Sequence, residues 1–239
     1  MHLKFVNEVD RVADLYPMEK SKDIPYGWLE RTREDFRSKS KDPSWKMHTH
    51  NHAARCPGIF NLLRTGWVMR TWTDITIETN GDGVSFQWRT PHDWGHPTID
   101  YFHERNLTKN FNNWPKDSLR HILKYNSGWR VNVPKGYYLL EMGIPYQDDS
   151  RFEILPGVFD RNYGWAAMNP FFRWNVKEGI ELIPAGTPIA QYILVPKDEI
   201  SHSCENYDPE KHRDVRLLDW IKQTKFVQDF AHWRKTFGD

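Results

Sequence analysis

The chain has 239 residues, a formal net charge of +1 and an aromatic content of 15%, made up of 12 Trp, 10 Tyr and 13 Phe. This length fits one large domain or two small ones. The balanced charge argues against a general nucleic-acid binder, which would show a clear basic excess. Low hydropathy can indicate disorder, but disordered chains lack aromatic residues. Because large rings bury roughly 150–250 Å² each, we expect a folded protein whose core and anchors depend on aromatic side chains.

Targeting and redox signals are weak. The only cysteines, Cys56 and Cys204, cannot form the framework of a disulfide-rich secreted domain. Residues 1–30 lack the apolar segment of a signal peptide. Nowhere do 18 uncharged apolar residues follow one another, so no membrane span is predicted. We therefore expect a soluble protein that no signal peptide exports.

Residues 1–55 are interpreted as an N-terminal arm. Four apolar residues near helical spacing predict a short docking helix at its start: Phe5, Val6, Val9 and Val12. Prolines then interrupt the pattern at positions 17, 25 and 43. We expect an irregular arm fastened by Trp28, Phe36 and Trp45, with a mobile leader as the alternative.

Residues 56–200 carry the predicted core. Pro57–Met69 predicts a short helix or turn that leads into an apolar strand. Thr71–Glu78 alternates with period two, which is typical of a half-buried strand, with Ile75 and Ile77 on one face. The turn sequence Asn80–Gly83 follows, and Val84–Arg89 alternates again. Residues 71–89 therefore predict a β-hairpin.

Residues 90–127 are predicted to form a long loop, because Pro91–Pro115 is polar, aromatic and without a clean period. Such a loop in a compact domain is often functional. Short strands separated by Gly and Pro are predicted after it, a spacing typical of a β-sandwich or barrel. Residues 201–239 are interpreted as a helical tail. The predicted strands are Gly128–Val133, Gly136–Pro145, Phe152–Leu155, Gly164–Trp174, Ile180–Ile183 and Pro188–Val195.

Three segments resemble the dUTPase and dCTP-deaminase-like β-clip superfamily in the right order. They are Pro134–Tyr138, Gly157–Tyr163 and Ala185–Gln191. Together with Cys56-Pro57 and Pro170–Phe172, they also resemble an uncharacterised phage-encoded protein family with such a core. The resemblance implies a mainly β fold, a β-clip barrel or sandwich, with the irregular arm and a C-terminal α-helix added.

The same resemblance implies a hydrolytic site. In dUTPases the aspartate of the second segment activates water and its tyrosine packs against deoxyribose, roles that would fall on Asp160 and Tyr163, with Mg²⁺ on the phosphates. However, the phosphate-binding segment expected after Tyr138 is replaced by Leu139–Pro145, and no glycine-rich flap ends the chain. An aspartate in a turn is also an ordinary structural residue. An enzyme is therefore the less favoured alternative.

Histidines suggest a second candidate site. His48, His50 and His52 would share one face of an extended segment, and three imidazoles suit zinc. The competing interpretation is a polar surface loop, because one strand rarely brings three such side chains onto a single ion. No other cofactor is predicted.

From the resemblance, the missing phosphate segment and the anchor-rich ends, we expect a non-enzymatic structural or assembly protein of phage type, in a virion or the host cytoplasm. It would act by self-association, with a trimer as one arrangement, or by docking on other virion subunits. No nucleic-acid or membrane partner is predicted. The alternative is a dUTPase-like nucleotide-binding or nucleotide-hydrolysing enzyme that uses Asp160 and Tyr163.

Overall fold

The computed structural model describes most of the chain: residues 2–39, 41–42, 52–92, 94–102, 107–160 and 164–212. The chain divides into two compact units. The first contains Met1–Trp28 and Gly58–Asp198, and the second contains Leu29–Pro57 and Glu199–Asp239. The predicted C-terminal helix falls mostly on residues 213–239, outside the described part. Across the described ranges, no helix is long and apolar enough to cross a membrane.

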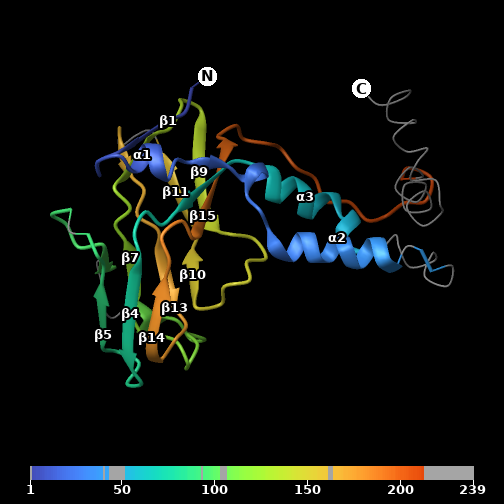
Figure 1. Cartoon of the computed structure of the whole chain (residues 1–239). Helices are drawn as coiled ribbons and strands as arrows, with labels where there is room; N and C mark the ends of the chain where they lie inside the picture. Colours follow the sequence, from blue (N-terminus) through green and yellow to red (C-terminus); the bar gives the residue numbers. More distant parts are fainter. Residues whose placement is uncertain are drawn as a thin grey trace. The chain divides into compact units, whose positions relative to one another are not determined.

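The first unit is mainly β and contains several antiparallel sheets (Figure 1). The largest has five strands in the order β11-β9-β15-β3-β2. On β9, Leu139 and Glu141 point inward, whereas Tyr138 is exposed, because successive side chains of a strand face opposite sides. In sheet order, the five strands are Gly157–Asp160, Tyr137–Gly143, Pro188–Pro196, Trp67–Arg70 and Glu19–Lys20.

Three smaller sheets complete this unit. The first, in the order β1-β8-β12, contains Lys4–Asn7, Trp129–Asn132 and Ala166–Ala167. The second, in the order β10-β13-β7-β6, contains Phe152–Leu155, Phe171–Trp174, Ile122–Tyr125 and Ile99–Tyr101. The third, in the order β14-β4-β5, contains Glu178–Ile183, Ile75–Asn80 and Phe86–Arg89.

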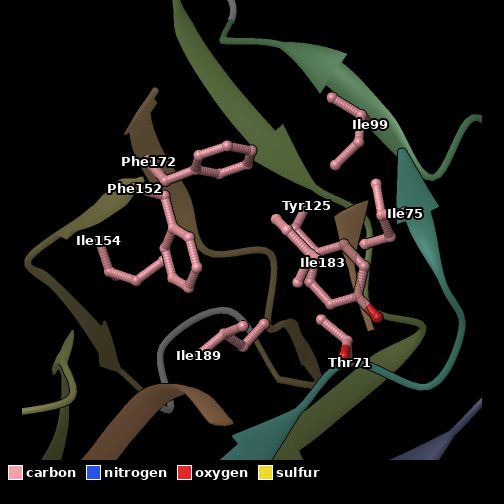
Figure 2. Close-up of a pocket in the computed structure, with 9 residues that line it drawn as sticks. All are labelled: Thr71, Ile75, Ile99, Tyr125, Phe152, Ile154, Phe172, Ile183 and Ile189. Atoms are coloured by element: carbon pink, nitrogen blue, oxygen red, sulfur yellow. The ribbon is translucent and has the colours of Figure 1, made fainter. Parts of the chain in front are cut away.

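All four sheets contribute to one apolar core. Trp174, Tyr192 and Leu139 are fully buried members of it. Figure 2 shows a small cavity in this core, where Phe152, Phe172 and several isoleucines surround a space of about 20 Å³. Such a space holds one water at most, and its lining is apolar apart from Thr71 and Tyr125. The cavity is therefore too small for an organic ligand.

Within the described residues, helices occur mainly in the first 64 positions. They are α1 (Val12–Leu15), α2 (Gly27–Lys39) and α3 (Pro57–Arg64), with 3₁₀ turns at Ser21–Asp23, Ala53–Arg55 and Leu107–Asn110. The end of α3 is closed by Gln191, whose Nε2 donates to the carbonyls of Leu62 and Thr65. Gly66 follows at φ +80°, and a Cβ there would lie 1.9 Å from the Tyr192 carbonyl oxygen. Only glycine fits this turn.

The prediction of an irregular N-terminal arm is wrong for much of its described length. The helix expected from Phe5 to Val12 is instead strand β1, followed by α1. β1 pairs with β8, and β2 pairs with β3, so both strands satisfy their backbone groups by pairing with distant strands. Residues 27–39 form a helix because the segment lacks proline and is rich in Glu, Arg and Lys.

The predicted loop at 90–127 is also partly wrong, because it contains β6 and β7. These strands pair with one another, and β7 pairs with β13. β6 has only three residues, too few for its period to be visible in the sequence. The segment predicted as the strand Gly164–Trp174 is divided into β12 and β13, separated by Met168–Pro170. Pro170 has no N–H to donate within a sheet.

The hairpin at 71–89 is confirmed in its pairing, since β4 and β5 are antiparallel, with Thr79 opposite Phe86. Its first strand begins later than predicted, at Ile75. The helix and strand expected from Pro57 to Met69 are confirmed as α3 and β3. The remaining predicted strands are confirmed as β8, β9, β10, β14 and β15.

Candidate functional site

Asp160 is positioned by the register of three strands. It ends β11 opposite Tyr138 of β9, and Tyr138 lies opposite Val195 of β15. These three side chains therefore share the outward face of the sheet. Lys197 follows β15, and its backbone N–H donates to the Gly136 carbonyl at 2.9 Å. This bond holds Lys197 beside the same face.

The Lys197 ammonium donates to Asp160 Oδ1 and lies 4.5 Å from the centroid of the Tyr138 ring. The Asp160 and Lys197 side chains are only 17% and 26% exposed, so a partly desolvated ion pair forms with a cation–π contact above it. This arrangement fixes the carboxylate and neutralises it. The catalytic role of Asp160 stays a prediction, and Tyr163 lies outside the described residues.

Apolar side chains surround this ion pair. Val158 is 59% exposed, and Tyr138 and Val195 are each 38% exposed. Val158 lies two positions before Asp160 on the same strand, so the three side chains occupy one face of β11, β9 and β15. We call Tyr138, Val158 and Val195, with the Asp160–Lys197 pair, the outer row. An exposed apolar group on a sheet is typical of a contact surface.

A second carboxylate lies on the inner face of the same sheet. Glu141 is 2% exposed and accepts a hydrogen bond of 2.6 Å from Tyr192 Oη. Burial raises the pKa of Glu141 to about 7, although the hydrogen bond from Tyr192 acts in the opposite direction. Glu141 does not line the apolar cavity, and the Tyr192 hydroxyl that donates to it also lies 3.9 Å from Met69 Sδ.

A pocket of about 650 Å³ lies away from the five-stranded sheet, beside the turn between β4 and β5. It is lined by residues from the β4–β5 turn, from Thr108–His121 and from the segment before β14. Four of its lining residues are cations: Lys109, Lys116, Arg120 and Lys177. We call this the basic pocket. It uses much of the segment that the sequence predicted to be a functional loop.

Of the three histidines of the predicted zinc site, His48 and His50 lie outside the described residues. At His52, Nδ1 accepts from the backbone N–H of Ala54, and Nε2 lies 3.3 Å from Asp35 Oδ2. Both ring nitrogens are therefore engaged within the protein. Hydrogen bonds from Lys39 and His52 lower the pKa of Asp35. Among the residues described, no group of three or more potential ligands could hold a metal ion.

Two of these features were missed by sequence reasoning. Glu141 has the same parity as the buried Leu139, but Leu140 beside it is also apolar, so the sequence does not show which parity faces inward. The basic pocket has no such signal, because its cations come from positions 109, 116, 120 and 177, which only the fold brings together.

Comparisons with known proteins give distant structural neighbours only. No protein-family model and no curated protein matches the chain. The dUTPase of EIAV is 14% identical, with 60% of this chain and 83% of that chain covered and a TM-score of 0.31. A mutant dUTPase from phage phi11 of S. aureus is 12% identical, with 61% and 85% covered and a TM-score of 0.32. A mutant dUTPase of Staphylococcus bacteriophage 80alpha is 14% identical, with 56% and 98% covered and a TM-score of 0.23. The chain, whose first unit is mainly β, has dUTPases among its distant structural neighbours.

Proposed function

We propose that this chain is a non-enzymatic assembly protein of phage type, with a β-clip core that associates with further copies of itself through the outer row. The observation that carries the proposal is the exposed apolar group of Tyr138, Val158 and Val195, centred on a neutralised ion pair. Covering this face costs less than covering an unpaired charge would, because Lys197 already compensates Asp160.

A second copy is the occupant that fits this face best. β11 is an edge strand, with β9 as its neighbour among the described strands. Edge strands offer unpaired backbone groups to another chain. The outer row lies directly on this edge, so apolar contact and backbone pairing would act together. The trimer suggested by the β-clip resemblance is one arrangement that uses such an edge.

Light scattering coupled to size-exclusion chromatography tests the proposal. The parent chain is expected to run as an oligomer, and Val158→Lys is expected to dissociate it. Ile180→Lys is the matched control, since Ile180 is an aliphatic residue 62% exposed on β14, in another sheet. A monomeric parent at high concentration, or dissociation by the Ile180 variant alone, would contradict the proposal.

Nucleotide hydrolysis at Asp160 is less well supported, because the Lys197 ammonium occupies one oxygen of the carboxylate. Thermal-shift measurements with deoxynucleoside triphosphates and Mg²⁺ separate the two functions, since a ligand that binds the folded state raises its melting temperature. We expect no shift. Hydrolysis that disappears in Asp160→Asn would establish the enzyme instead.

A further inference from the structure

The basic pocket gathers cations from segments far apart in the sequence. Lys109 belongs to the 3₁₀ turn Leu107–Asn110, Lys116 and Arg120 to the segment after it, and Lys177 to the segment before β14. A Cβ added at Gly83 would lie 3.6 Å from Arg120 Nε and 3.9 Å from Lys177 Cε. These two side chains therefore flank the same glycine of the β4–β5 turn.

The four cations form no ion pair with the residues that the structure describes. The pocket lining contains no acidic side chain among the residues that the structure describes. Across the same residues, no carboxylate forms an ion pair with Lys109, Lys116, Arg120 or Lys177. The chain as a whole carries a net charge of only +1, so this concentration of positive charge is local. Like charges held together favour an anionic ligand.

The walls of the pocket are held by hydrogen bonds. Thr108 Oγ1 donates to the Arg120 carbonyl, and the Arg120 N–H donates to the Gly83 carbonyl at 2.7 Å. Trp114 Nε1 donates to the Leu119 carbonyl at 2.9 Å, and Ser118 Oγ contacts Asn175 Oδ1 at 3.0 Å. The loop that carries the cations is thus fixed before any ligand arrives, which lowers the entropic cost of binding.

An aromatic surface lies beside the cations. Trp114 lines the pocket, and the centroid of the Phe111 ring lies 5.6 Å from the centroid of the Trp114 ring. Phe111 is 49% exposed. Arg173 stands 5.7 Å from the Trp114 centroid, but its charge is paired with Glu153. The exposed ring that contacts the pocket lining is therefore that of Phe111, through Trp114.

We infer that the basic pocket binds single-stranded nucleic acid, with the phosphates against the four cations and a base stacked on Phe111. Cations that follow a backbone, beside rings that stack on bases, are the two elements of single-strand recognition. The inference is independent of the proposed assembly function, since it uses neither Asp160 nor the outer row.

Single-stranded nucleic acid fits these features better than a single phosphate group or a nucleic-acid duplex does. Four cations around a space of about 650 Å³ exceed what a single phosphate needs. Duplex recognition commonly inserts a helix or a β-ribbon into a groove, whereas this site is a concave group of loops. An exposed ring contributes to binding only where a base is free to unstack onto it.

Fluorescence anisotropy with the full chain and a labelled 12-nucleotide oligo-dT is the direct test. We expect saturable binding at 50 mM salt. Four phosphate contacts predict a slope of log K against log salt of about −3. The same sequence as a duplex is expected to bind at least about tenfold more weakly, because its bases cannot reach Phe111.

Matched variants assign the binding to the pocket. Lys109→Gln, Lys116→Gln and Lys177→Gln together should weaken binding at least about tenfold and bring the salt slope to about −1. The control replaces Lys20, Lys22 and Lys135, which are exposed elsewhere, by glutamine. It should leave the affinity and the salt slope near those of the parent. Phe111→Ala should weaken binding at least about fivefold, whereas Phe111→Tyr should preserve it.

Four results would overturn the inference. They are an absence of binding at 50 mM salt, equal losses in the two triple variants, duplex binding as strong as strand binding, and displacement of the strand by micromolar pyrophosphate or a nucleoside triphosphate. The last result would show a pocket for small phosphate compounds. A circular-dichroism spectrum of each variant that matches the parent confirms that lost binding does not come from lost folding.

Discussion

The outer row and the basic pocket place charge in opposite ways within the same unit of the chain. In the outer row, Lys197 opposes Asp160 and lies over Tyr138, so the face is neutral and apolar. In the basic pocket, four cations face a common space, and the described residues form no ion pair with them.

This difference shows that a balanced sequence does not imply a balanced surface. A net charge of +1 describes the sum of 33 basic and 32 acidic residues and says nothing of their distribution. Paired charges make an apolar face less costly to cover than an unpaired charge would, whereas unpaired cations attract anions. The first arrangement favours contact with protein, and the second favours contact with phosphate.

The largest effect is expected where a carboxylate has no cation at all, at Glu141 on the inner face of the same sheet. Its pKa is raised from 4.5 to about 7 by burial. The folded chain thus holds a proton that the unfolded chain loses, and stability falls as pH rises from about 4.5 to 7. Glu141→Gln removes this loss and keeps the hydrogen bond from Tyr192.

At pH 8 we expect the free energy of unfolding of Glu141→Gln to exceed that of the parent by about 3 kcal/mol. The difference should become small near pH 4.5. Urea denaturation at both pH values measures it, and other titrating groups cancel because both chains carry them. A difference that does not change with pH would contradict the raised pKa.

An intermediate effect is expected from breaking the pair in the outer row. Lys197→Met removes the ammonium that donates to Asp160, and we expect a loss of unfolding free energy of about 1–3 kcal/mol. Adding Asp160→Asn should recover part of that loss, since the carboxylate charge that Lys197 compensates is then removed as well. Arg89→Met, at the exposed Arg89–Glu78 pair, is the control and should change stability by less than about 1 kcal/mol. Equal losses at the two pairs would show that the Asp160 pair is an ordinary surface contact.

The smallest effect is expected at the basic pocket. Replacing Lys109, Lys116 and Lys177 by glutamine relieves repulsion between exposed like charges. We expect a gain in unfolding free energy of about 0.5 kcal/mol or less, which disappears in high salt as the charges are screened. A clear loss of stability would mean that these side chains support the fold, and the pocket would then be structural.

Sequence patterning predicted the strands with clear alternation or with glycine and proline at their ends. The β4–β5 hairpin and the strands β8, β9, β10, β14 and β15 belong to this group. Patterning failed for short strands that depend on a distant partner. β1, β2 and β6 have four, two and three residues, and each is a strand only because another strand satisfies its backbone groups.

The candidate site was predicted only in part. Asp160 was identified from a family resemblance, but its partner Lys197 is 37 positions away and no local pattern links the two. Two of the three predicted histidine ligands and Tyr163 lie outside the described residues, so those predictions stay open. Glu141 was missed because Leu139 and Leu140 are both apolar, so the sequence does not show which face of β9 points inward.

The sequence by itself determined that this protein folds and that it is mainly β, because composition and short-range periodicity encode those properties. Tertiary structure alone decided which charges are paired. In the sequence, nothing distinguishes Lys109, Lys116 and Lys177 from Lys197. They differ in what the fold places beside them, since Lys197 is paired with Asp160 and the other three line the basic pocket. Electrostatic energy depends on distance in space, and distance along the chain does not predict it.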